Sequence, residues 1–348
     1  MAAMADAAAT ASMGTHSGTF HCDEALGIWM LRQLPEWKEA ALVRSRDHEV
    51  LKDCTIVIDV DGEYDHATKR YDHHQRGFFE TFDGEAGVAT DAESATGEFK
   101  TKLSACGLVY KHYGREVLQA VAEVNGWGSL EGPRLEAVYY KMYKEMIEGL
   151  DAIDNGIEVA DEKRYSEGTG LSKRVARMNP RWCDPKEGKE GENAKFELAS
   201  TATGTEFTEQ LDMLINSWLA ARDFVEAALK VRLEVDASGE VIQFPSGGMP
   251  WKDHLYTLEK EMGVETLVKF VLYTDQGGMW RIQAVTQEGT AFTNRLSLPE
   301  AWRGLRNAEL CAAVGIEGCT FVHNAGFIGG HETLEGAKTM VQKALELA

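Results

Sequence analysis

The sequence has little positive charge and no long apolar run, and each absence excludes a class of protein. Its 348 residues include 36 Lys and Arg against 56 Asp and Glu, which gives a net charge of −20. An overall electrostatic field that attracts nucleic acid is therefore excluded, because phosphate backbones bind clustered positive charge. No apolar run reaches the roughly 18 residues of a membrane-spanning helix, so we expect no membrane partner. Binding of phosphates through metal ions and a few local cations remains compatible with this composition.

The cysteines and the N-terminus lack the features of two further classes. The six cysteines contain no CxxC pair, so neither a zinc ribbon nor a dithiol redox site is indicated. The N-terminal sequence MAAMADAAATASMG contains no Lys or Arg, whereas a secretory signal begins with basic residues and a mitochondrial presequence is Arg-rich. We therefore interpret residues 1–13 as a flexible tail and expect an intracellular protein with reduced thiols.

What the sequence does contain is a pattern of two α/β domains, which its length also suggests. With 44% apolar residues it can build hydrophobic cores. Strand, loop, helix and strand follow one another within the first 60 residues, which is typical of a sheet with crossover helices. The first domain is predicted over 14–229, with strands at 41–45 and 55–60 and helices at 24–34, 104–124, 133–150 and 206–230. The second is predicted over 230–348, with strands at 231–235, 240–244, 266–274 and 279–285 and a helix at 332–346.

Two polar segments interrupt the first domain. Residues 80–100 carry six acidic side chains and one basic side chain, and we interpret them as a mobile acidic insertion. An ordered loop that closes over a site is the alternative. Residues 184–195 are predicted as a second polar loop.

Histidine and aspartate recur at the ends of predicted elements in four separate segments. They are His16, His21 and Asp23 in THSGTFHCDE, Asp59 after TIVIDV, Asp72, His73 and His74 in YDHHQ, and Asp151 and Asp154 in LDAIDNG. Ligands that follow strands converge at the carboxyl edge of an α/β sheet, and a carboxylate there is costly to bury without a cation or hydrogen bonds. Imidazole and carboxylate groups together suit Mn, Fe, Zn or a similar divalent ion. We therefore predict a metal site.

In order, these segments resemble the metal-binding motifs of DHH-type phosphoesterases. GTHSGTFHCDEALG, YDHHQRGF, DAIDNG, PWKDHLYTLE, YTDQGGMWRIQAV, PEAWRGLR and GFIGGH are similar to one branch of that superfamily, the melanocyte-proliferating-gene (Myg) family. That family was long described as uncharacterised and is now regarded as a 3′–5′ RNA exonuclease. The resemblance implies a catalytic domain with a mainly parallel sheet and a smaller C-terminal α/β domain of the DHH-associated type. It also implies residence in the mitochondrion, the nucleus or both, and leaves the cytoplasm open.

The resemblance implies roles for particular residues. The metal ligands would be His16, His21, Asp23, Asp59, His73 and Asp154, with Asp151 as a competitor for the last place. Asp72 and His74 would act in catalysis, His74 facing the substrate phosphate or leaving group. HSGTFHCDEA departs from the usual HxxxDxDA pattern, because it is one residue longer and has His21 where the first aspartate stands. Two divalent ions are implied, and mixed His and Asp ligands favour Mn²⁺ over Mg²⁺.

The stretch GFIGGHETLEGA over 326–337 is similar to the substrate-binding GGGH motif of the DHH-associated domain. Gly329 and Gly330 would let backbone amides approach a phosphate ahead of a helix, and His331 would contact phosphate or sugar. A tight turn before the last helix is the alternative interpretation.

Three functions are weighed. The resemblance favours a metal-dependent exonuclease on single-stranded RNA or short oligonucleotides, with a homodimer left open. The net charge favours a phosphohydrolase on small substrates, such as pyrophosphate, short oligonucleotides or cyclic dinucleotides, because long RNA is repelled. A non-catalytic metal-binding interaction protein is the third, and the intact ligand set argues against it.

Overall fold

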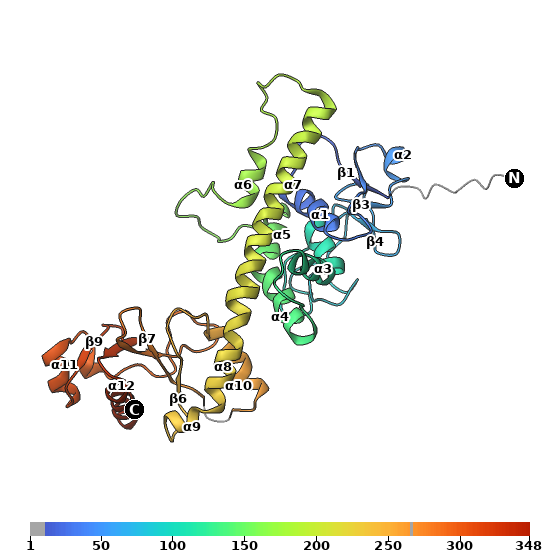
Figure 1. Ribbon diagram of the computed structural model, residues 1–348. Coiled ribbons are helices and arrows are strands. Elements are labelled where there is room, and N and C mark those ends of the chain that lie inside the picture. The colour runs from blue at the N-terminus through green and yellow to red at the C-terminus, as the bar shows by residue number, and fades with distance from the viewer. Residues whose placement is uncertain (1–10, 265–266) are drawn as a thin grey trace. The chain divides into compact units, whose positions relative to one another are not determined.

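A computed structural model describes residues 11–264 and 267–348 and shows a mixed α/β protein (Figure 1). The chain divides into two compact units, Met1–Ile215 and Asn216–Ala348. The division falls inside the helical stretch 188–230, as does the boundary at 229/230 that the sequence predicted. Among the described residues, no helix is both long and apolar enough to span a bilayer.

The first unit is built on a mixed five-stranded sheet in the order β2-β1-β3-β5-β4. Its strands are β1 (Ser12–Thr15), β2 (Ala41–Arg44), β3 (Ile56–Ile58), β4 (Tyr64–Asp65) and β5 (Arg70–Tyr71). β1, β2, β3 and β5 run parallel, and only β4 runs antiparallel to its neighbour. All three residues of β3 are buried, as expected for a central parallel strand covered on both faces.

Helices surround this sheet. They are α1 (Cys22–Arg32), α2 (His48–Leu51), α3 (Ala105–Val124), α4 (Gly132–Met142), the π-helical turn η1 (Tyr143–Ile147), α5 (Glu148–Asp154), α6 (Leu171–Ala176) and α7 (Gly188–Met213). Contacts with both α3 and α7 (Figure 1) cover α1 so well that nine of its eleven residues are buried. Trp29 of α1 packs on Phe207 of α7 with ring centroids 5.3 Å apart. The helix therefore holds its N-terminus rigidly at the sheet edge.

The second unit contains a mixed sheet in the order β6-β7-β8-β10-β9, with helices packed on both faces. Phe270 and Leu272 face one apolar cluster and Val271 faces the other, so neighbouring residues of one strand alternate between the faces. The strands are β6 (Val241–Gln243), β7 (Phe270–Thr274), β8 (Trp280–Ala284), β9 (Cys319–Val322) and β10 (Ile328–His331). The helices are α8 (Ala220–Lys230), α9 (Arg232–Val235), α10 (Lys252–Glu261), η3 (Glu300–Trp302), α11 (Asn307–Val314) and α12 (Leu334–Glu346), with η2 (Leu214–Leu219) at the boundary.

Three predicted segments differ from the structure. Residues 231–235 were predicted as a strand but form α9, because they continue the turn after α8 and none of the residues in this helix is buried against a sheet. The loop predicted at 184–195 is wrong from residue 188 onward, because α7 begins at Gly188. Of the predicted tail 1–13, Ser12 and Met13 lie in β1, while residues 1–10 lie outside the described part of the chain.

The acidic segment 80–100 is anchored by aromatic side chains rather than free. Phe82 is 5% exposed and stacks on Tyr143 with ring centroids 3.8 Å apart. Phe99 is also buried, and its backbone N–H donates to Asp83 at 3.1 Å. The expectation of a mobile insertion is therefore corrected. Acidic composition hid two aromatic anchors whose burial outweighs the cost of ordering the loop.

The close packing of α1 and α7 can be tested at Gly204. A Cβ atom there would lie 2.0 Å from Nε1 of Trp29. We expect Gly204→Ala to lower the free energy of unfolding by about 1–3 kcal/mol, because the clash outweighs the roughly 1 kcal/mol that alanine gains in a helix. Thermal and denaturant unfolding measure this change. Gly149→Ala in α5 is the control, since nothing lies within 4 Å of its added methyl group, and equal stability of the two variants would contradict the packing described.

Candidate metal centre

Three of the predicted segments follow three adjacent parallel strands. His16 follows β1, Asp59 follows β3, and Asp72 with His73 follows β5. The chain goes from β1 to β2 on one side and returns to β3 on the other, so the strand order reverses between β1 and β3. Ligand sites of open α/β sheets lie at such reversals, outside the carboxyl ends of the strands. The topology therefore brings these side chains to one edge.

Asp59 lies at the centre of the cluster. Its Oδ2 is 3.2 Å from Nε2 of His16, and its Oδ1 is 3.3 Å from Nε2 of His73 and 3.5 Å from Nδ1 of His74. The residue has φ 58°, a left-handed conformation that aspartate tolerates better than most residues. The turn directs the carboxylate across the strand ends, between the two buried imidazoles.

The N-terminus of α1 supplies carboxylates from the second side. His21 is the exposed N-cap, and its backbone N–H donates to Oε1 of Glu24 at 2.9 Å, as in a capping box. The same Oε1 lies 3.0 Å from Nε2 of His16. Glu24 was not among the predicted site residues, although an acid three residues after the capping residue was the signal that could have indicated it. Asp23 is 1% exposed and lies in a group with His21 and Asp154.

The charges in this cluster shift one another's pKa. Burial disfavours the charged imidazoles, but Asp59 and Glu24 outweigh it and raise the pKa of His16 to about 10. Asp154 and Asp59 likewise outweigh burial and raise the pKa of His73 to about 9. Burial raises the pKa of Asp59, yet His16 and His73 hold it well below its usual range. Without a cation, the buried acids therefore retain protons on their histidine neighbours.

Several buried polar atoms of the cluster have no hydrogen-bond partner among the described residues. They are both carboxylate oxygens of Asp23, Oδ1 of Asp59 and both ring nitrogens of His73. Nε2 of His73 is within ion-pair distance of Asp59 and Asp154, but neither carboxylate forms a hydrogen bond with it. Burial raises the pKa of Asp23 well above its usual range, and the neighbouring acids Asp59, Asp154 and Glu24 add to this effect. Unpaired buried acids beside imidazoles fit divalent cations.

Possible ligand atoms form three overlapping groups within the described residues. In each group the atoms lie within 4.8 Å of one another. The groups are His16, His21, Glu24 and Asp59; Asp59, His73 and His74; and His21, Asp23 and Asp154. Asp59 and His21 are each shared by two groups, so this arrangement could hold more than one ion.

Asp72 and His74 form a pair at the rim. Nδ1 of His74 lies 2.7 Å from Oδ1 of Asp72, which also accepts the backbone N–H of His74 at 3.0 Å. Asp72 accepts a further backbone N–H from Gly62. Burial raises the pKa of Asp72, but these hydrogen bonds outweigh it and lower the pKa. An ionised carboxylate only accepts, so Nδ1 carries the proton and Nε2 of the largely exposed His74 is left available.

Asp151 and Asp154 differ in their surroundings. Oδ2 of Asp154 lies 3.1 Å from Nε2 of His73, in the cluster. Asp151 is fully buried elsewhere, where Oδ1 accepts the backbone N–H and the hydroxyl of Ser104 at 2.9 and 2.8 Å. Its Oδ2 accepts the hydroxyl of Tyr143 at 2.9 Å. Burial raises the pKa of Asp151 to about 7 despite these donors. Asp151 thus links α5 to the start of α3.

The glycines predicted to bind substrate are in contact with protein atoms. Gly330 lies in β10, and a Cβ there would be 2.5 Å from both Arg281 and Thr320. Gly329 is similarly close to Leu298. His331 is buried, and its Nδ1 accepts the backbone N–H of Thr333 at 3.0 Å. A substrate role for these residues stays a prediction.

Two residues outside the predicted motifs hold the loop between His16 and His21. The amide of Asn179 pairs with the backbone of Phe20, accepting its N–H at 2.9 Å and donating to its carbonyl at 2.8 Å. Arg44 is buried, stacks over Phe196, and donates to the carbonyls of His16 and Gly18. No pattern in the sequence indicated these contacts, because Asn179 lies 159 residues from its partner.

The chain as a whole is similar to proteins of a known family. The family model described as "Uncharacterised protein family (UPF0160)" matches residues 12–345. A Mus musculus protein named MYG1 exonuclease is 48% identical over 336 residues, which cover 96% of this chain and 84% of that protein. The Homo sapiens protein of that name is 47% identical over 335 residues, covering 96% and 85%. The MYG1 protein of Saccharomyces cerevisiae is 39% identical over 339 residues, covering 95% and 94%.

Among solved structures, RecJ from Thermus thermophilus in complex with Mn²⁺ is a distant match. It is 16% identical, and the alignment covers 96% of this chain and 52% of that chain. The TM-score of 0.22 is too low for a conclusion about fold or function.

The raised pKa values predict how the metal-free protein responds to pH. A histidine whose pKa lies above its unfolded value of about 6.5 stabilises the fold below that value, and this stabilisation is lost as pH rises through its folded pKa. We therefore expect the melting temperature in EDTA to fall between about pH 6.5 and pH 10 as His16 and His73 lose their protons. Asp59→Asn should give a shallower slope, because both histidines lose a shared carboxylate. Calorimetric scans across this range measure it, and identical slopes would refute the coupling.

Two variants can distinguish the role of Asp151 from that of Asp154. Asp154→Asn should weaken Mn²⁺ binding at least about tenfold and lower the stability of the metal-free protein less than Asp151→Ala does, because it removes only the ion pair with His73. Asp151→Ala should lower the free energy of unfolding by about 2–4 kcal/mol, because buried donors of Ser104 and Tyr143 lose their acceptor, while Mn²⁺ affinity is retained. Titration calorimetry and denaturant unfolding provide the two readouts. The reverse pattern would exchange the roles of the two aspartates.

Proposed function

Because the chain belongs to the MYG1 exonuclease family, we propose that it is a metal-dependent phosphodiesterase that removes nucleotides from the 3′ end of single-stranded RNA. The observation that carries the proposal is Asp23, whose two carboxylate oxygens are buried without a hydrogen-bond partner among the described residues. Its acidic neighbours raise its pKa further. Such a group is costly to bury in a protein that binds no cation.

The residues present fit two divalent ions, with Mn²⁺ suited to the mixed ligands. His16, His21, Glu24 and Asp59 would hold one ion, and His73, Asp154 and Asp23 would hold the second with Asp59 between them. Ions bound there would activate a water molecule and neutralise the charge of a phosphodiester. Bound ions would make the field at the site locally positive, although the whole chain carries a net charge of −20.

The remaining chemistry belongs to Asp72 and His74. Asp72 accepts from Nδ1 of His74 at 2.7 Å and so fixes the orientation of the ring. His74 has a side chain that is 61% exposed, so its Nε2 can reach a substrate at the rim. A protonated His74 would donate to the leaving 3′ oxygen, and Asp72 would stabilise the imidazolium that this step needs.

Cleavage of labelled RNA tests the proposal. We expect purified protein with Mn²⁺ to shorten a 5′-labelled single strand stepwise from its 3′ end and to release nucleoside 5′-monophosphates. EDTA should abolish the reaction. Asp59→Asn should reduce the rate at least about a hundredfold, since loss of an outer contact to a metal ligand alone often costs about 10–100-fold.

Asp61→Asn is the matched control, because Asp61 lies two residues away, also has a positive φ, and contacts His48 rather than the cluster. It should retain nearly full activity. Full activity of Asp59→Asn would overturn the proposal. Cleavage rates measured on RNA strands of increasing length distinguish this exonuclease from a phosphohydrolase on small substrates. The small-substrate alternative predicts rates that do not depend on length beyond two or three nucleotides.

A further inference from the structure

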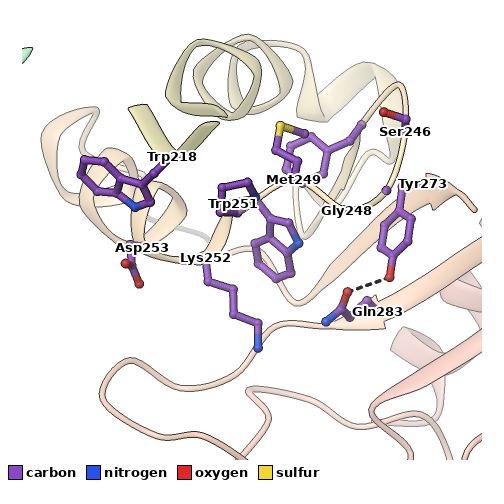
Figure 2. A pocket seen from close by; sticks show the side chains of 12 residues that line it. Trp218, Ser246, Gly248, Met249, Trp251, Lys252, Asp253, Tyr273 and Gln283 are labelled. Atoms are coloured by element: carbon purple, nitrogen blue, oxygen red, sulfur yellow. Dashed lines mark hydrogen bonds between the residues drawn. The ribbon is translucent and has the colours of Figure 1, made fainter. Parts of the chain in front are cut away.

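The second unit contains a pocket of about 470 Å³ that the metal centre does not use. Figure 2 shows its lining, which comes from η2, the segment before α10, and strands β7 and β8. Its volume lies within the range of about 300–1,000 Å³ that is usual for small-ligand sites. The pocket is formed entirely by residues of one unit.

Aromatic rings form its walls. Trp251 is only 6% exposed and packs near Phe244, with ring centroids 6.2 Å apart. Tyr273 lies on another wall, and Trp218 lies near the opposite end (Figure 2). Because Trp251 and Tyr273 are held by the core cluster of this unit, they offer preorganised surfaces to a flat ligand. Nucleic-acid bases stack on aromatic rings of this kind independently of the nucleotide sequence.

The SGG turn shapes the pocket beside Tyr273. A Cβ on Gly247 would lie 2.6 Å from the tyrosine ring, and its N–H donates to the carbonyl of Thr274 at 2.9 Å. Gly248 has φ +85° and no heavy atom within 4 Å of the position of a Cβ. The first glycine therefore lets the turn pack against the ring, and the second leaves open space above it.

Polar groups occupy defined places among these rings. The hydroxyl of Tyr273 donates to Oε1 of Gln283 at 2.8 Å (Figure 2), which leaves the amide N–H groups of Gln283 as donors. Nζ of Lys252 lies 5.9 Å from the centroid of the Trp251 ring. Lys252 is the first residue of α10, so its cationic charge lies at the N-terminal end of this helix, where anions are favoured. Asp253 lines the end near Trp218.

We propose that this pocket binds one nucleotide, with the base stacked on Trp251 and Tyr273 and the phosphate held by Lys252. Every base presents an acceptor that the amide of Gln283 can bind, so the site would not distinguish sequence. Two arginines of the unit are engaged elsewhere: Arg281 pairs with Asp275, and Arg295 pairs with Glu259. The proposal deepens the exonuclease function, on which its choice of ligand rests. The nucleotide would come from the RNA strand or from the released monophosphate.

Titration calorimetry of the full chain with AMP in EDTA tests the site independently of metal chemistry. We expect AMP to bind about tenfold more tightly than adenosine, and inorganic phosphate not to bind measurably. Lys252→Met keeps the apolar stem and should weaken AMP about tenfold, while adenosine affinity is unchanged. Tyr273→Leu should weaken both ligands. Lys260→Met is the control, because Lys260 is an exposed lysine of the same helix that pairs with Glu288.

The outcomes separate this proposal from the nuclease. The proposal that the pocket binds a nucleotide is overturned if folded Lys252→Met and Tyr273→Leu proteins bind AMP with unchanged affinity. It is also overturned if inorganic phosphate binds as tightly as AMP. If RNA is not cleaved by any form but AMP binding depends on Lys252, the nuclease fails and the nucleotide site stands. With active protein, a higher KM for RNA in Lys252→Met at unchanged kcat identifies the strand as the source. An unchanged KM with weakened AMP binding identifies the free monophosphate.

Discussion

Buried negative charge at the edge of the first sheet is the constraint on which the rest of this unit depends. Asp23, Glu24 and Asp59 are each at most 4% exposed, and together they cannot remain ionised without positive partners. In the metal-free protein the partners are the protons of His16 and His73. Cations could replace those protons, so the charges that are costly to bury would also provide affinity for a metal ion. The stability of the first unit and its proposed metal binding therefore depend on the same side chains.

The fold supports this concentration of charge with rigid surroundings. Three parallel strands deliver their ends to one edge, and α1, buried between α3 and α7, fixes the position of its first turn. Arg44 adds a buried cation that binds main-chain carbonyls of the His16 loop. A centre built in this way needs little rearrangement to bind ions, which favours precise geometry over adaptability.

The sequence predicted what depends on local pattern. Apolar runs located β3 and β7, and the spacing of His16, Asp59 and His73 at strand ends located the cluster. It favoured Asp154 only through the resemblance and kept Asp151 as a competitor, because one partner of the buried Asp151, Ser104, lies 47 residues away in the chain. It also failed where composition misled: acidic residues hid Phe82 and Phe99, and alternation at 231–235 suggested a strand where no sheet partner exists among the described residues. Contacts between distant segments decide such cases, and no local pattern encodes them.

The clamp between Asn179 and Phe20 has a consequence for biosynthesis. The two residues are 159 positions apart, which corresponds to about 8–30 s of translation at roughly 5–20 residues per second. Within that interval Asp59 and His73 are synthesised before Asp154, and the hydrogen bonds between Asn179 and Phe20 cannot form until its end. The metal centre therefore assembles late, after much of its own unit has been synthesised. Ions captured earlier would meet an incomplete set of ligands.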